Sequence, residues 1–131
     1  MAKRPRGVRN NNPLNIRIGI KWKGLREKQT DKAFSQFVTP EYGARAAIRV
    51  FRTYRRRYDR KTVKAIIERW APPNENDTQA YIRAVADRLG WRPSKVVSEK
   101  DYPALAWAMH IVECGGIFWD VGMFERGAKM A

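Results

Sequence analysis

One stretch of the sequence, "DYPALAWAMHIVECGG" at residues 101–116, constrains the fold more than any other. Asp101 can cap a helix, Pro103 suits a first helical turn, and Gly115 can end the helix. The side chains between them are almost all apolar, and a helix that is apolar on every side has to be buried. We therefore expect a central helix here, with the rest of the chain packed around it.

Three further helices are predicted from apolar side chains that recur at helical spacing. They begin at Thr39, at Thr62, and at Asp77 or Thr78, where each start signal precedes an amphipathic stretch. Gly90 is expected to end the third of these. The sequence thus predicts four or five helices in all.

The segment "NIRIGIKW", residues 15–22, alternates apolar with other side chains, which predicts a half-buried strand. With "AFSQF" at residues 33–37 it would form a small β-hairpin. Residues 1–9 are expected to be a basic flexible arm, and residues 10–131 a single domain. The predicted fold class is mainly α (α+β), with a small N-terminal hairpin and a buried helix near the C-terminus.

The net charge of +14 is concentrated in one half of the chain. Residues 1–69 contain 20 Lys and Arg against 5 Asp and Glu, whereas residues 70–131 contain 7 against 8. Such a surface attracts polyanions, and nucleic acid, anionic lipid and the acidic polymers of a bacterial envelope all remain open on this evidence. A single cysteine and a single histidine argue against an internal disulfide and a zinc site, so no cofactor is expected.

The acid of most chemical interest is Glu113, in the last turn of the apolar helix. Apolar surroundings and the negative end of the helix dipole should both raise its pKa. A carboxyl that stays protonated near neutral pH can act as the general acid in glycosidic cleavage. The alternative is a partly exposed glutamate paired with an arginine. His110 and Cys114 nearby are expected to have no catalytic role.

Two polar segments could bind a sugar or could simply be turns. "RWAPPNENDTQAY" offers Trp70, Asn76 and Thr78 beside Glu75, or it could be a connector that caps the next helix. "RNNNPLNIR", residues 9–17, offers the asparagines at 11, 12 and 15, or it could be a turn whose side chains bind their own backbone.

Together these motifs resemble a group of small phage and prophage virion-associated proteins. The resemblance runs from about Arg6 to Glu113 and is carried by "RNNNP.NIR", "F..F..PEYGARA", "RWAPP.EN.T..Y" and a late "E.GG". Two positions depart from the family pattern. Leu14 stands where a glycine is usual, and "VECG" at residues 112–115 stands where "HENG" is common. Members are generally taken to be structural virion proteins or lysozyme-like enzymes that degrade peptidoglycan.

A more distant resemblance connects the chain with glucosaminidases of the lysozyme superfamily. "NNPLNIRIGIKWKG" and "FSQFVTPEYGARAAI" are similar to their later segments, in the same order. The part that resembles their glutamate helix comes last here, at "LAWAMHIVECGG". We therefore expect a lysozyme-like domain in circularly permuted order, which is physically reasonable because chain ends often lie close together.

These resemblances imply a lytic transglycosylase or muramidase that needs no cofactor. Glu113 would be the general acid/base, and Glu75 or Glu41 the second carboxylate where one is used. The predicted catalytic residues are Glu113, Glu75 and Tyr81. The predicted glycan-binding residues are Asn11, Asn12, Asn15, Trp70, Asn76 and Thr78.

The expected partners are peptidoglycan, anionic envelope polymers and other virion proteins, with the chain itself a monomer. The start, "MAKRPRGVRN", lacks the apolar core of a secretory signal, so we expect synthesis in the host cytoplasm. Access to the cell wall would then depend on the virion or on a holin. The alternative function is a non-catalytic virion protein that binds nucleic acid through its basic half.

Overall fold

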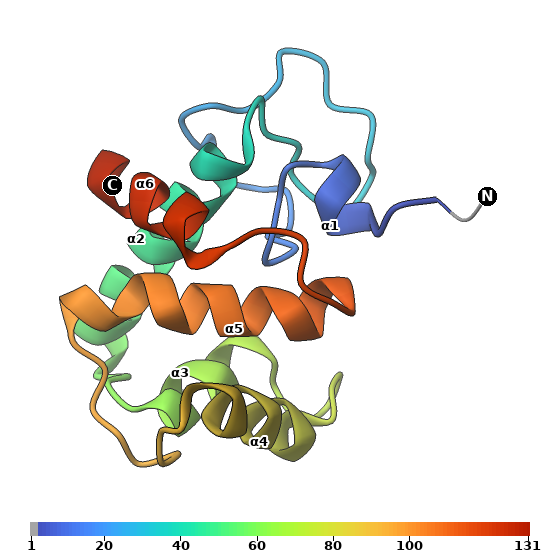
Figure 1. Ribbon diagram of the computed structural model, residues 1–131. Coiled ribbons are helices and arrows are strands. Elements are labelled where there is room, and N and C mark those ends of the chain that lie inside the picture. The colour runs from blue at the N-terminus through green and yellow to red at the C-terminus, as the bar shows by residue number, and fades with distance from the viewer. Residues whose placement is uncertain (1–2) are drawn as a thin grey trace.

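Helix α5 (Tyr102–Cys114) lies at the centre of the computed structural model, which describes residues 3–131. Helix α6 (Val121–Met130) lies on one side of it, and α3 (Val63–Trp70) and α4 (Thr78–Leu89) lie on the other (Figure 1). Helix α2 (Pro40–Tyr58) begins beside α6 and crosses α5 near the N-terminal end of α5. A 3-10 turn at Glu99–Asp101 leads into α5. A short helix, α1 (Arg6–Arg9), lies beside the end of α5. The molecule is therefore mainly helical, and its apolar central helix is buried as predicted.

Most predicted helix boundaries are confirmed. Helix α2 follows Thr39, and Thr62 caps α3 by accepting a hydrogen bond from the Ala65 amide. Asp77 caps α4 in the same way, and Gly90 ends α4 in a left-handed conformation that glycine adopts without strain. These boundaries depend on interactions within a few residues, which is why the local sequence predicts them.

Asp101 has a different role from the one predicted. Its carboxylate accepts hydrogen bonds from the Ser98 amide and hydroxyl instead of capping α5. The carboxylate of Asp101 therefore stabilises the 3-10 turn that precedes α5, and not α5 itself. Gly115 ends α5 in a left-handed conformation, as expected.

The sequence did not predict helix α6. Asp120 caps it by accepting a hydrogen bond from the Met123 amide. The helix packs closely on α2 at Gly127, where a Cβ atom would lie 2.7 Å from the Cβ of Ala44 and 2.8 Å from the Glu41 carbonyl oxygen. Any larger residue at position 127 would force the two helices apart.

The predicted N-terminal hairpin is present only as a single antiparallel bridge. Arg17 pairs with Phe34, so the two predicted segments do meet, but neither forms a regular strand. Ile16 is buried, but Ile18 and Ile20 are 49 % and 59 % exposed, so the alternation does not mark a buried face. Gly19, at φ 142°, interrupts the extended backbone between them.

The N-terminal segment is more ordered than the predicted flexible arm of residues 1–9. Residues 6–9 form α1, in which Gly7 and Val8 are buried. Arg6 pairs with Asp31, with Nη2 2.6 Å from Oδ1. Met1 and Ala2 lie outside the described residues.

The loop between α1 and α2, residues 10–39, is held by buried amide side chains. Asn12 is fully buried; its Nδ2 donates to the carbonyl oxygens of Ile16 and Ser35, and its Oδ1 accepts from the Ile16 amide. Buried backbone groups without a strand partner need such side-chain partners. Asn12 therefore supplements the short backbone pairing between residues 16–18 and 33–35. Among residues 3–131, no helix is both long enough and apolar enough to cross a membrane.

We predict that Asn12→Ala destabilises the protein by about 3 kcal/mol, because it leaves the Ile16 amide and the Ser35 carbonyl without a partner and removes one of the two donors to the Ile16 carbonyl. Urea unfolding followed by tryptophan fluorescence measures this change. Asn74→Ala, at an exposed position, is the matched control and should change stability by less than about 0.5 kcal/mol. Equal stability of the two variants would contradict the role assigned to Asn12.

Candidate functional site

The carboxyl group of Glu113 is held where three parts of the chain meet. It extends from the last turn of α5, and its Oε2 accepts a hydrogen bond of 2.9 Å from the Tyr81 hydroxyl on α4. Its Oε1 accepts a bond of 3.1 Å from Asn15 Nδ2, in the loop after α1. Asn15 also donates to the Glu113 backbone carbonyl. The sequence separations are 32 and 98 residues, so only the folded chain forms this arrangement.

Burial raises the pKa of the Glu113 carboxyl, although hydrogen bonds from Tyr81 and Asn15 act in the opposite direction. Within residues 3–131, no lysine or arginine forms an ion pair with Glu113. The arginine-paired glutamate that the sequence left open is therefore not what the structure contains. Burial also raises the pKa of Tyr81 well above its usual value, so its hydroxyl stays protonated and can donate.

Glu113 lines a cavity of about 200 Å³, called here the acid cavity. Trp70, Glu75 and Asn76 line it from the end of α3 and the loop that follows, and Asn15 and Arg17 from the N-terminal loop. Five predicted site residues, from three separate segments, thus share one cavity: Asn15, Trp70, Glu75, Asn76 and Glu113.

A second cavity of about 230 Å³ adjoins the first and shares Asn15, Arg17 and Trp70 with it. The remaining lining is mostly apolar and aromatic, so we call it the aromatic cavity; it consists of Ile16, Ile20, Trp22, Val50 and Tyr54. Together the two cavities form a cleft that is polar at the acid and apolar farther away. A cleft of this kind suits a ligand with both hydroxyl groups and apolar ring faces.

Asn11, Asn12 and Thr78, three of the predicted glycan-binding residues, do not line the cleft. Asn11 donates to the carbonyl oxygens of Phe37 and Val38, and Asn12 is fully buried in the loop. The buried Thr78 hydroxyl donates to the carbonyl of Ala71. Their hydrogen bonds are made to the protein backbone, so these residues support the cleft and are not available to a ligand.

Tyr81, a predicted catalytic residue, and Glu41, a candidate second carboxylate, do not line the cleft either. Tyr81 is buried behind the Glu113 carboxyl, and it is absent from the lining of the acid cavity. It therefore acts through Glu113. Glu41 pairs with Arg126 of α6, at 3.1 Å, and does not line the cleft. Glu75 remains as the second carboxylate of the cleft.

The cleft residues that sequence reasoning missed include Arg17, Ile20, Trp22 and Tyr54. The alternating pattern assigned Arg17 to the solvent face of a strand, and helical spacing assigned Tyr54 to the core. Arg17 lies over the Phe34 ring, 5.2 Å from its centroid, at the edge of the acid cavity. The only feature of the sequence that could have indicated Arg17 as a cleft residue was its position two residues after Asn15, a predicted glycan-binding residue.

His110 and Cys114 are satisfied in the interior, as expected. The Phe118 amide donates to His110 Nε2, the Nδ1 contacts the Trp107 carbonyl, and burial lowers the pKa of the ring. Burial raises the pKa of the Cys114 thiol to about 12, so the reactive thiolate is scarce at neutral pH.

Comparison with known proteins finds one informative relative. Over 126 residues the chain is 43 % identical to Protein P5 of Pseudoalteromonas phage PM2, and the aligned part covers 93 % of this chain and 79 % of the relative. No family model matches the chain. The relative agrees with the predicted bacteriophage character of the sequence.

We predict that Tyr81→Phe raises the pKa of Glu113 further, because the lost hydrogen bond favours the ionised carboxyl. Carbon-13 NMR of the labelled glutamate carboxyl groups, followed from pH 3 to 9, measures the shift. Tyr58→Phe removes an exposed hydroxyl from α2 and should leave the titration of Glu113 unchanged. A lower pKa in Tyr81→Phe would show that the hydroxyl does not stabilise the carboxylate.

Proposed function

This chain belongs to the family of Protein P5 of Pseudoalteromonas phage PM2, and we propose that it is an enzyme that cleaves the glycan strand of bacterial peptidoglycan. One observation carries the proposal. Glu113 is a half-buried carboxyl with a raised pKa and no cationic partner among the described residues, and it opens on a cleft lined by amides and aromatic rings. Carbohydrate cleavage needs a proton donor of this kind.

In the proposed reaction, the protonated Glu113 gives its proton to the glycosidic oxygen as the bond from that oxygen to the sugar carbon breaks. The carboxylate that forms accepts hydrogen bonds from Tyr81 and Asn15. Such bonds are stronger to a charged acceptor than to a neutral one. They therefore stabilise the negative charge as it develops, which lowers the barrier more than it stabilises the bound substrate.

Two routes complete the reaction, and they differ in the role of Glu75. A hydrolase needs a second carboxylate to activate water or to bind the sugar carbon, and Glu75 lines the same cavity as Glu113. A lytic transglycosylase needs none, because a hydroxyl group of the same sugar attacks and Glu113 takes up its proton. In both routes the proposed glycan contacts are Trp70 and Asn76, which line the same cavity as Glu113.

The proposal includes a lysozyme-like fold in circularly permuted order. In support, the loop after α1 lies against the last turn of α5, where Asn15 contacts Glu113. The acid-bearing helix thus comes late in the chain while its cleft partner comes early. We further propose that the protein acts as a monomer on the cell wall, reached from the virion or through a holin.

We predict that Glu113→Gln lowers the rate of peptidoglycan cleavage by about 100-fold or more, the usual effect of removing a general acid. Clearing of purified sacculi at pH 5–8 measures the rate, and circular dichroism checks the fold. Glu125→Gln, at an exposed position on α6, is the matched control and should retain the wild-type rate. A wild-type protein that never clears sacculi would refute the proposal. Tight, salt-sensitive DNA binding by that inactive protein would instead support the virion role.

The two routes are separated by their products and by Glu75→Gln. Mass spectrometry of the digest shows anhydro-muropeptides for a transglycosylase and reducing ends for a hydrolase. If the wild-type digest contains anhydro-muropeptides, we predict that Glu75→Gln remains active. If it contains reducing ends, we predict that Glu75→Gln is inactive. Reducing ends from a fully active Glu75→Gln would exclude Glu75 as the second carboxylate.

A further inference from the structure

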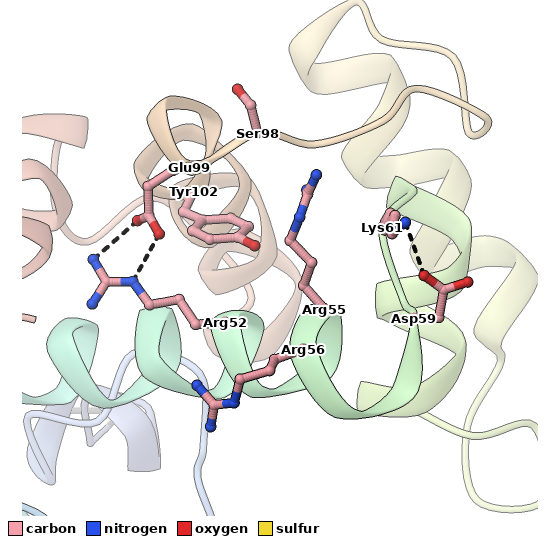
Figure 2. Close-up of a pocket in the computed structure, with 8 residues that line it drawn as sticks. All are labelled: Arg52, Arg55, Arg56, Asp59, Lys61, Ser98, Glu99 and Tyr102. Atoms are coloured by element: carbon pink, nitrogen blue, oxygen red, sulfur yellow. Dashed lines mark hydrogen bonds and ion pairs between the residues drawn. The ribbon is translucent and has the colours of Figure 1, made fainter.

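Two adjoining cavities along α2 share an arginine-rich lining. One, of about 350 Å³, is lined by Trp22, Arg49, Arg52, Thr53 and Arg56. The other, of about 560 Å³, shares Arg52 and Arg56 and extends past Arg55 to Lys61 and Tyr102 (Figure 2). We call the two together the arginine groove.

Ion pairs neutralise part of the positive charge of the arginine groove. Arg52 donates to both carboxylate oxygens of Glu99, at 2.8 and 3.0 Å, and Lys61 lies 2.9 Å from Asp59. Arg49 and Arg56 have exposed side chains and form no ion pair with any of residues 3–131. In Figure 2, Arg56 points away from both acids of the groove.

The positive charge of the arginines on α2 affects a neighbouring arginine. Burial, and then the positive charge of Arg49 and of Arg52, lowers the pKa of Arg45. Arg45, Arg49, Arg52 and Arg56 fall on one stripe of α2, about 16 Å long at 1.5 Å per residue. The stripe is therefore a region of positive potential that an anionic ligand would relieve.

The arginine groove adjoins the cleft. Trp22 lines both the groove and the aromatic cavity. The aromatic cavity in turn shares Asn15, Arg17 and Trp70 with the acid cavity. The three cavities thus follow one another from Glu113 to Arg56, each sharing lining residues with the next.

We infer that the arginine groove binds carboxylate groups on the peptides of the peptidoglycan strand whose glycan lies in the cleft. This inference rests on the proposed function. Guanidinium groups bind carboxylates with two parallel hydrogen bonds, and Arg49 and Arg56 have their donors free of ion pairs. The groove thus selects strands that carry acidic peptides over uncharged glycan.

Nucleic acid fits the groove less well. Binding of single strands depends on exposed aromatic faces beside the cations. Here the Tyr102 ring is buried, so Trp22 is the one aromatic ring among the groove's lining residues that is open to a base. Nor would a nucleic-acid site need to adjoin a cleft that ends in an acid.

The test uses Glu113→Gln as a full-length, non-cleaving parent and adds Arg49→Gln with Arg56→Gln. Arg57→Gln with Arg88→Gln, both at exposed positions outside the groove, removes the same charge and is the control. Isothermal titration measures binding of soluble peptidoglycan fragments and of the same fragments with their carboxyl groups converted to amides. An uncharged N-acetylglucosamine oligomer serves as the probe for the cleft.

We expect amidation to weaken binding to the parent and to the control by about tenfold or more, the loss of at least one good charge-assisted pair. It should leave binding to the groove variant unchanged. An equal effect of amidation on all three proteins would overturn the inference, as would a groove variant that is impaired only for a DNA oligonucleotide. The proposed function is tested separately. It fails if the wild-type protein does not cleave peptidoglycan and the parent does not bind the uncharged oligomer.

Discussion

The buried amide of Asn12 is the interaction on which the cleft wall depends. Residues 10–39 contain no regular strand, yet they place Asn15 and Arg17 beside the acid. A loop of this length keeps one conformation only when its buried backbone groups are paired. Asn12 pairs three of them, and Gln36 continues the network to Asn10. The asparagine-rich segment is therefore mainly a structural support, and Asn15 is its contribution to the site.

The features that the sequence predicts well are those that depend on neighbours along the chain. Thr62, Asp77 and Gly90 bound their helices through contacts within one turn. The hydrogen bonds of Asn12 to Ser35 and of Asn11 to Val38 span 23 and 27 residues, and no local pattern contains them. The alternation at residues 15–22 correctly predicts the pairing with residues 33–37 but overestimates its length, since the pairing is limited to a single bridge, at Arg17 and Phe34.

The basic half of the chain is less uniform after folding than its composition suggests. Arg6 pairs with Asp31, the Arg26 guanidinium bonds backbone carbonyls of Arg9 and Phe37, and Arg45 donates to the Met130 carbonyl. These cations hold the loop and the last helix in place. A charge count therefore overestimates how much of the positive charge can meet a polyanion.

The hydrogen bond from Asn15 to Glu113 joins positions 98 residues apart. A growing chain that has not yet released α5 from the ribosome already contains Asn15 but lacks the acid that Asn15 contacts. Once the chain is complete, melting either the early loop or the end of α5 exposes the carboxyl to water, where its pKa returns towards the ordinary value. The proton affinity of this group is thus a property of the finished tertiary structure, and it is gained and lost together with the fold.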